Sequence, residues 1–311
     1  MQMGPIWGID LGGTKIEGAI LEDKHSAVAL KRLRIPTEAD KGYEHIVNQI
    51  VRMVEVLSIE AGMRPQHIGI GTPGVLDPST QKMKNCNSTA LNNQMLKRDL
   101  EHVLNVPVTL ANDANCFAYA ETMLGAVKEQ KPNAKVTFGV IMGTGVGGGL
   151  IVNGNVIGGM HGIGGEWGHN FLDASGGDCY CGRKGCVETI ISGPALERYY
   201  ENLMRIHLPL KEIINRYHEG HDEVADKTVN RMLKFFGKGM ANIINIIDPD
   251  AIILGGGLSH IDLLYEEGVA EVEKYVFNDR LTTPFLRPKL GDSAGVFGAA
   301  LLKSHMKDTV D

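Results

Sequence analysis

The sequence predicts a two-domain α/β protein. With 311 residues, the chain exceeds the usual size of one hydrophobic core and allows two domains of about 150 residues each. Two separate segments, near residues 5–22 and 134–152, each read as a strand, a glycine turn and a second strand. Apolar strands and segments with helical spacing alternate after each of them. This repeated order indicates a duplicated α/β unit.

In the first domain we expect three strands, a helix, two further strands and another helix. The strands fall at about 5–10, 15–22 and 28–35. The helix over 42–61 places Ile46, Ile50, Val54 and Leu57 at helical spacing. Apolar runs at 67–74 and 106–113 read as strands that end in polar or glycine residues, and the Ala-rich segment 114–123 reads as a helix.

The second domain repeats the opening pattern. Strands are predicted at 134–142 and 146–152, followed by an Asn-Gly turn and a third strand. Helices are then expected near 225–247 and 262–277, with a strand at 251–257 between them. A closing helix is expected over 293–306.

Composition and charge narrow the function classes. The net charge is −6, 43% of residues are hydrophobic, and no cluster of lysine and arginine stands out, so a nucleic-acid surface is not expected. The N-terminus shows no basic region followed by an apolar stretch, and no run of about 18 apolar residues occurs, so neither secretion nor membrane insertion is expected. We therefore expect a cytoplasmic, reducing location.

One histidine and three of the five cysteines gather between residues 168 and 188. We call the segment from Cys179 to Cys186 the knuckle. Its chain can reverse direction at Gly182 and Gly185, because glycine adopts backbone angles that other residues resist. Unliganded thiols are the alternative, and a redox Cys-x-x-Cys pair is absent. Four protein ligands would saturate a tetrahedral zinc ion and leave no position for a reacting water, so the expected Zn²⁺ is structural. The expected ligands are His169, Cys179, Cys181 and Cys186.

Glycine-rich loops follow apolar strands at 10–15, 143–149 and 255–257. The second loop matches G-x-G-x-x-G, but a strand rather than a helix follows it, so a dinucleotide fingerprint is excluded; a Walker loop is absent as well. Each loop alone is equally well explained as a tight turn. Three together favour a nucleotide site, because bare backbone N–H groups bind phosphates.

Two aspartates are candidates for chemistry. Asp113 lies between an apolar strand and a helix, where it can be an N-cap or a carboxylate that accepts the proton of a sugar hydroxyl during phosphoryl transfer, and both roles can coexist. Asp10 precedes Gly12 and Gly13, and is either a turn residue or a group close to Mg²⁺.

Five segments together carry a family resemblance: GIDLGGTK, LANDANCFA, MGTGVGGG, GEWGH and CYCGRKGCVE. They resemble the ROK family of sugar kinases and sugar-responsive repressors, from about residue 6 to 303. The segments KNCNSTALNNQ, GEWGHN, CYCGRKGCVETIISG and VFGAALL are most similar to the bacterial fructokinase (mannokinase) branch. Repressor members carry a DNA-binding region before the DLGGTK segment, where this chain has nine residues.

The resemblance implies a two-domain actin-like (ribonuclease H-like) sugar kinase fold with ATP and sugar in a cleft between the domains. The expected domains are 1–115 with a C-terminal helix at about 294–311, and 116–293 with the zinc loop. The implied catalytic base is Asp113. Residues implied to bind the sugar are Asn87, Asn112, Glu166, His169 and Glu188. Residues implied to bind ATP and Mg²⁺ are Asp10, Gly12, Gly13, Thr14, Lys15, Gly143, Thr144, Gly145, Gly255 and Gly256.

The implied reaction is phosphorylation of a hexose at its primary 6-hydroxyl, from fructose to fructose 6-phosphate, with mannose as a further substrate. Alternatives are kinases of glucose, N-acetylglucosamine or N-acetylmannosamine, and a sugar-binding regulator without a DNA-binding domain. A homodimer is expected. Zinc would tie Glu166 to Glu188 for sugar binding, whereas the phosphate loops, remote in sequence, are expected to be independent of it.

Overall fold

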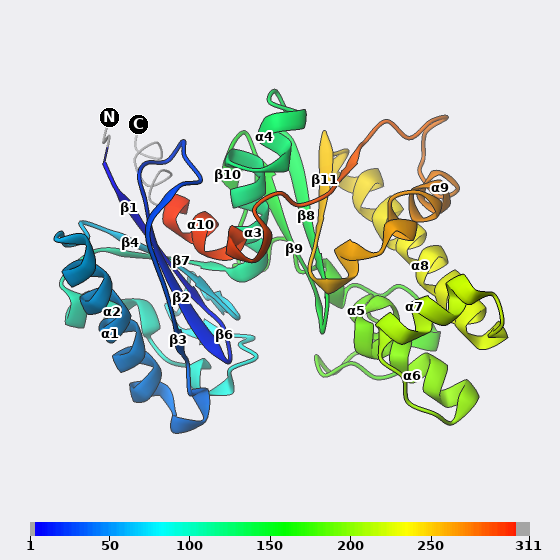
Figure 1. Ribbon diagram of the computed structural model, residues 1–311, viewed down its shortest axis with the longest axis horizontal. Coiled ribbons are helices and arrows are strands. Elements are labelled where there is room, and N and C mark those ends of the chain that lie inside the picture. The colour runs from blue at the N-terminus through cyan, green and yellow to red at the C-terminus, as the bar shows by residue number, and fades with distance from the viewer. Residues whose placement is uncertain (1–3, 303–311) are drawn as a thin grey trace. The chain divides into compact units, whose positions relative to one another are not determined.

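The computed structural model describes residues 4–302, which form two mixed α/β units (Figure 1). Unit 1 comprises the residues up to Lys135, Gly149–Gly165 and the residues from Pro288 onward. Unit 2 comprises Val136–Gly148 and Glu166–Arg287. Unit 1 thus extends past residue 115 and takes in a segment from the middle of the chain.

The sheet of unit 1 has the strand order β3-β2-β1-β4-β7. Its first three strands form an antiparallel meander, and the last two add in parallel beside β1. The bounds are β1 (Ile6–Leu11), β2 (Lys15–Leu21), β3 (Ala29–Pro36), β4 (Ile68–Thr72) and β7 (Val108–Asn112), with a separate hairpin of β5 (Val75–Leu76) and β6 (Met83–Lys84). The helices of this unit are α1 (Tyr43–Ala61), α2 (Leu96–Leu104), α3 (Asp113–Met123), α4 (Ala126–Gln130) and α10 (Ala294–Leu301).

These bounds confirm the strands and helices predicted for the first domain. The prediction did not include α2, α4 or the β5–β6 hairpin. Helix α10 confirms the closing helix as far as Leu301. Residues 303–306 of that prediction lie outside the described residues.

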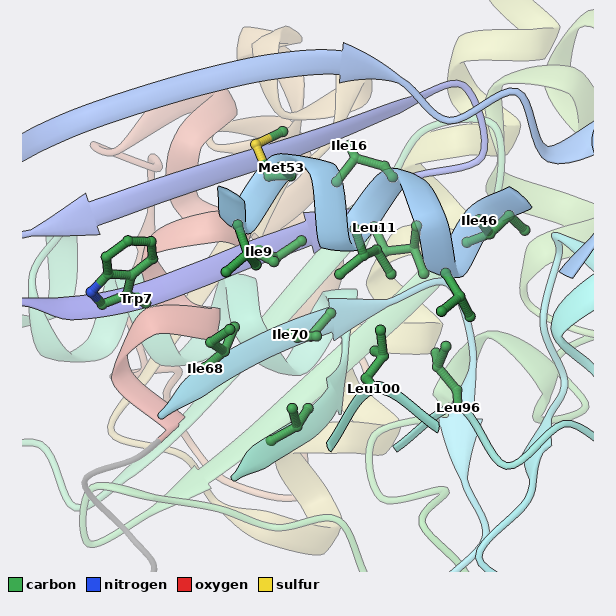
Figure 2. Packing of buried hydrophobic residues seen from close by; sticks show 14 of the residues in the cluster. Trp7, Ile9, Leu11, Ile16, Ile46, Met53, Ile68, Ile70, Leu96 and Leu100 are labelled. Atoms are coloured by element: carbon green, nitrogen blue, oxygen red, sulfur yellow. The ribbon is translucent and has the colours of Figure 1, made fainter. Parts of the chain in front are cut away.

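One face of the first sheet is covered by α1 because apolar residues alternate along its strands. Trp7, Ile9 and Leu11 of β1 and Ile68 and Ile70 of β4 are buried on this face. Figure 2 shows them packed with residues of α1 and α2, including Ile46, Met53, Leu96 and Leu100. Burial of such side chains stabilises the fold by about 1.5–3 kcal/mol each.

The opposite face of the sheet carries glycines, which allow α10 to approach the backbone closely. A Cβ atom on Gly69 would lie 1.8 Å from the carbonyl oxygen of Ala299, and one on Gly8 would lie 2.3 Å from that of Val296. Alternation along β1 places Asp10 on the same face as Gly8. The first turn of α10 therefore lies against Asp10, whose carboxylate oxygen would be 2.9 Å from a Cβ on Gly295.

The second sheet has the order β10-β9-β8-β11-β12. β11 pairs in parallel with β8 and β12, and β10 pairs antiparallel with β9. This order repeats that of the first sheet, which supports the predicted duplication. The bounds are β8 (Val136–Met142), β9 (Val146–Val152), β10 (Asn155–Val156), β11 (Ala251–Gly255) and β12 (Phe285–Leu286).

The helices of unit 2 are α5 (Glu188–Ile191), α6 (Gly193–Met204), α7 (Leu210–Glu219), α8 (Glu223–Ile247) and α9 (Glu267–Glu273). The helix predicted near 225–247 is confirmed as α8, whereas α6 and α7 were not predicted. None of the helices within residues 4–302 is long and apolar enough to span a bilayer.

The helix predicted near 262–277 is confirmed only in its middle part, and its predicted bounds are wrong. A short 3₁₀ helix at Asp262–Leu264 is followed by α9, which ends at Glu273. Beyond it, the Asn245 side chain of α8 accepts a hydrogen bond from the Phe277 N–H at 2.8 Å and donates one to the Tyr275 carbonyl at 3.2 Å. A side chain from another helix therefore satisfies backbone groups that a longer α9 would have satisfied itself.

Candidate active site

Asp113 lies at the start of α3, where the chain leaves the C-terminal end of β7. The N-cap is Asn112, whose Oδ1 accepts hydrogen bonds from the N–H groups of Ala114 at 2.8 Å and Asn115 at 3.2 Å. Asp113 is therefore the first helical residue, and its Oδ1 accepts a bond from the Ala114 N–H at 2.7 Å. The alternative that Asp113 is the N-cap is wrong, because its neighbour has that role.

Asp113 is exposed to solvent, although protein surrounds its carboxylate closely enough to shift its pKa. Protein around the residue raises its pKa above the ordinary value by desolvation, while the N–H of Ala114 and its own N–H act in the opposite direction. Because Asn112 already caps the helix, the helix does not depend on Asp113 for its first hydrogen bonds. The carboxylate thus has the properties required of a proton acceptor at the C-terminal end of the parallel strands β4 and β7.

Asp10 lies within β1 rather than in the turn that follows it. Its carboxylate lies beside Gly71 of β4 and Gly295 of α10. Burial raises its pKa to about 7, and the negative charges of Asp113 and Glu17 act in the same direction, against Lys15 and Arg34. A divalent cation beside this carboxylate would relieve the repulsion, so the residue fits the surroundings expected of Mg²⁺.

The raised pKa of Asp10 predicts that stability falls as pH rises from about 4 to about 7. The unfolded chain releases this proton near its ordinary pKa of 3.8, whereas the folded protein holds it to about 7. The folded state therefore binds more protons in this window, and the free energy of unfolding decreases with rising pH. The side chain introduced by Asp10→Asn is uncharged at every pH in this window. The free energy of unfolding of this variant should therefore fall less steeply with rising pH than that of the wild type.

Urea unfolding at several pH values in this window, without nucleotide or divalent metal, measures the two slopes. Asp279→Asn, which removes an exposed carboxylate from unit 2, is the control and should keep the wild-type slope. Equal slopes for wild type and Asp10→Asn would contradict a proton held by Asp10.

The β1–β2 turn holds the first glycine loop. Its Gly12 N–H donates to the Lys15 carbonyl at 3.0 Å. Thr37 stabilises the turn with two hydrogen bonds. Its hydroxyl donates to the Gly12 carbonyl at 2.7 Å, and its N–H donates to the Thr14 carbonyl at 3.0 Å. Gly13, Thr14 and Lys15 are exposed. The carbonyls of Gly12 and Thr14 are thus occupied, while the tip of the turn stays accessible to a ligand.

Asn87 lies in the same unit, after the short strand β6. Its N–H donates to the Pro73 carbonyl at 3.2 Å, and its side chain is exposed. The next residue, Ser88, adjoins the glycine turn, since a Cβ on Gly13 would lie 3.5 Å from the Ser88 Oγ. Unit 1 therefore brings the first glycine loop and the Asn87 segment together.

In unit 2 the other two glycine loops lie side by side, because β8 and β11 are parallel neighbours and both loops follow their C-terminal ends. The Gly143 N–H donates to the Gly145 carbonyl at 2.9 Å, which closes the β8–β9 turn. A Cβ on Gly143 would lie 3.7 Å from the Gly257 nitrogen. Gly256 has φ +76°, and a Cβ there would lie 2.4 Å from the Met142 carbonyl oxygen, so this position requires glycine. Thr144 at the tip and Gly256 are exposed, whereas Gly255 is buried at the end of β11.

The cysteine knuckle brings the four predicted ligands to one point. The ligand atoms of His169, Cys179, Cys181 and Cys186 all lie within 4.8 Å of one another. The Cys179 Sγ is 3.6 Å from the His169 Nδ1, and the Cys181 Sγ is 3.7 Å from the Cys186 Sγ. Thiolates bound to zinc at about 2.3 Å in a tetrahedron are separated by roughly 3.8 Å. The donor set and its spacing therefore fit a closed tetrahedral zinc site.

Two carboxylates flank this cluster. Glu166 directly precedes the 3₁₀ turn that contains His169, and Glu188 begins α5, two residues after Cys186. The Glu188 Oε2 accepts a hydrogen bond from the Val146 N–H at 2.9 Å and would lie 2.7 Å from a Cβ on Gly145. Glu188 thus joins the knuckle to the β8–β9 glycine loop, although 42 residues separate the two partners. One of the loops expected to be independent of the knuckle is therefore in contact with it through Glu188.

Sequence reasoning did not single out Tyr180. Its hydroxyl is 2.9 Å from the His169 Nε2, and the two rings meet edge to face. Desolvation, followed by the negative charge of Glu188, raises the pKa of the Tyr180 hydroxyl to about 12, so the hydroxyl stays protonated at neutral pH. An aromatic hydroxyl between two expected metal ligands was the signal that could have identified it.

The predicted site residues therefore form two groups. Unit 1 holds Asp10, Asn112, Asp113, Asn87 and the first glycine loop, and unit 2 holds the knuckle, Glu166, Glu188 and the other two loops. Thr37 and Tyr180 are the additional residues that the structure identifies.

Residues 6–305 match the sequence model of the ROK family. The N-acetyl-D-glucosamine kinase of Vibrio atlanticus is 35% identical over 306 residues, which cover 95% of this chain and 98% of that protein. The ROK hexokinase structure from Thermus thermophilus is 31% identical, with a TM-score of 0.85 and coverage of 96% and 97%. The ROK family glucokinase from Streptomyces griseus, solved with glucose and AMPPNP, is 28% identical, with a TM-score of 0.76 and coverage of 96% and 98%. These structural likenesses confirm the predicted two-domain actin-like α/β fold.

Proposed function

The chain belongs to the ROK family, and we propose that it is an ATP-dependent sugar kinase that phosphorylates N-acetylglucosamine at its primary 6-hydroxyl. The sugar is proposed from the Vibrio atlanticus relative, whose name specifies N-acetyl-D-glucosamine and which matches nearly the whole chain. None of the three relatives described above is named for fructose. N-acetylglucosamine, an alternative in the sequence analysis, therefore replaces fructose as the first candidate.

The observation that supports the kinase chemistry best is the position of Asp113. Its carboxylate is exposed at the start of α3, and the capping role belongs to Asn112. In the proposed step the 6-hydroxyl oxygen attacks the γ-phosphorus of ATP, its proton passes to Asp113, and ADP leaves. A loose phosphoryl-transfer transition state mainly requires alignment of the nucleophile, so a carboxylate of modest basicity suffices.

Unit 2 supplies the proposed contacts that recognise the sugar. The two carboxylates of Glu166 and Glu188 would accept hydrogen bonds from sugar hydroxyls, and His169 would donate one from its Nε2. Bound zinc would hold the knuckle closed without an open position for a substrate, so its role is structural. Asn87 and Asn112 are the proposed sugar contacts of unit 1. The Oδ1 of Asn112 caps α3, so its Nδ2 would donate to the sugar.

The glycine loops supply the proposed ATP contacts. Backbone N–H groups at the exposed loop positions Gly13, Thr14, Thr144 and Gly256 suit phosphate oxygens, and Lys15 adds a positive charge. The N–H groups of Gly12 and Gly143 close their own turns, so these glycines, with Gly145 and Gly255, shape the loops around the phosphates. Asp10 is the carboxylate proposed to lie near Mg²⁺, which would neutralise charge on the transferred phosphoryl group.

A sugar panel tests this function. Coupled ADP release should give the highest kcat/KM with N-acetylglucosamine, at least about tenfold above fructose, because buried polar groups matched to one set of substituents discriminate strongly against another. N-acetylmannosamine, glucose and mannose complete the panel, and Asp113→Asn measures the background of ATP hydrolysis. The highest kcat/KM on fructose would return the chain to the fructokinase branch. Sugar binding without turnover would instead favour a regulator.

A further inference from the structure

His169 has two ring nitrogens, and each already has a partner in the sugar-free protein. The Nδ1 faces the Cys179 Sγ at 3.6 Å, and the Nε2 lies 2.9 Å from the Tyr180 hydroxyl. With a metal on Nδ1, the single ring hydrogen must be on Nε2, so this N–H donates to the Tyr180 oxygen. The imidazole then has one donor and no further hydrogen to give.

This leaves one hydrogen for two acceptors. If His169 recognises a sugar hydroxyl, it does so through the same Nε2–H that the Tyr180 oxygen accepts. We infer that Tyr180 is a positioning residue that holds the His169 Nε2–H in the sugar-free protein and gives way to a sugar oxygen when substrate binds. The inference rests on the proposed function, because it takes the ligand of unit 2 to be a sugar.

The surroundings of Tyr180 allow this exchange. Its side chain is 74% exposed, so it can turn away without opening the core. It occupies the second position of the turn from Cys179 to Gly182, closed by the Gly182 N–H on the Cys179 carbonyl at 2.9 Å. The backbone of the knuckle therefore stays fixed while the ring moves.

The exchange affects which sugars bind well. A sugar that places an oxygen at the His169 Nε2 replaces the tyrosine bond, whereas a sugar without one leaves Tyr180 in place or leaves the donor without a partner. The tyrosine thus lowers the affinity for every sugar that displaces it from His169. A sugar that displaces it without supplying an oxygen also leaves the donor unpaired, and therefore binds least well.

The test is calorimetric binding of N-acetylglucosamine to zinc-loaded protein without ATP. Tyr180→Phe keeps the ring and removes only the hydroxyl, so the sugar Kd should fall by about two- to tenfold, the net effect of one hydrogen bond that binding no longer breaks. Bound zinc, measured by metal analysis after incubation with a chelator, should equal that of the wild type, because water can reach the exposed Nε2–H. Tyr199→Phe is the matched control: it retains the ring that stacks on Arg231 and should leave the sugar Kd unchanged.

An unchanged or raised Kd in Tyr180→Phe overturns the inference. So does loss of zinc from this variant, which would make the hydroxyl a support for the metal site. Wild-type protein that binds N-acetylglucosamine but transfers no phosphate would contradict the proposed function. The inference about Tyr180 would then still be tested by the sugar Kd of Tyr180→Phe. Wild-type protein that binds none of the panel sugars would overturn both.

Discussion

Replacing Asp113 by asparagine should lower kcat by about 10²- to 10⁴-fold while sugar still binds. Asparagine keeps the shape of the side chain. It also keeps an oxygen that can accept the hydrogen bond from the Ala114 N–H, which the Asp113 Oδ1 accepts at 2.7 Å. Asn112 continues to cap α3. The variant therefore loses the proton acceptor and little else. Steady-state ADP release gives kcat, and calorimetry without ATP gives the sugar Kd.

The control for the change of charge is Glu223→Gln. Glu223 is likewise the first residue of a helix, α8, and is exposed, so its replacement removes a comparable interaction with a helix N-terminus. Glu223→Gln should lower the free energy of unfolding by about as much as Asp113→Asn does, by up to about 1 kcal/mol, and should leave kcat unchanged. An Asp113→Asn enzyme with more than about a tenth of the wild-type kcat would reduce Asp113 to a structural residue of α3.

The second large effect is expected at the knuckle. Cys181→Ser should remove stoichiometric zinc and raise the sugar KM by about 10- to 100-fold, because loss of a ligand frees the segments that carry Glu166 and Glu188. The ATP KM should rise as well, by a smaller factor. Glu188 reaches the Val146 N–H beside the Gly143–Gly145 turn, so a loose knuckle disturbs this loop too.

Metal analysis and initial rates on both substrates measure these effects. Cys86→Ser changes a thiol outside the cluster, in unit 1, and should retain one zinc per chain. His169→Ala should be at least as harmful as Cys181→Ser, since it removes a ligand and the proposed sugar contact together. A Cys181→Ser enzyme with wild-type sugar KM would be incompatible with this account of the knuckle.

Local patterns in the sequence predicted most of what is local in the structure. The strands of the first sheet follow from the alternation of residues such as Trp7, Ile9 and Leu11, and the helix α1 follows from its apolar spacing. The four ligands of the knuckle were predicted because they lie within 18 residues and because clustered thiols have few other roles in the reducing location that the sequence analysis expected.

Contacts between distant residues were not predictable in this way. The bond between Glu188 and the Val146 N–H depends on how the knuckle folds back on β9. The end of α9 depends on Asn245 of α8, and nothing near residue 274 indicates that contact. The N-cap of α3 was ambiguous because Asn112 and Asp113 both have side chains that cap helices, and only the backbone angles distinguish them.

The close approach of α10 to Gly8 and Gly69 bears on the order in which the chain folds during synthesis. The strands that α10 covers are complete by residue 112, but the helix itself begins at Ala294, after all of unit 2 has been made. One face of the first sheet therefore has no cover from α10 while the ribosome translates the intervening residues. Unit 2, whose segments end at Arg287, is fully synthesised before that helix emerges. The last helix of the described residues thus completes a sheet whose strands were made long before it, and such distant pairing is slow compared with local contacts.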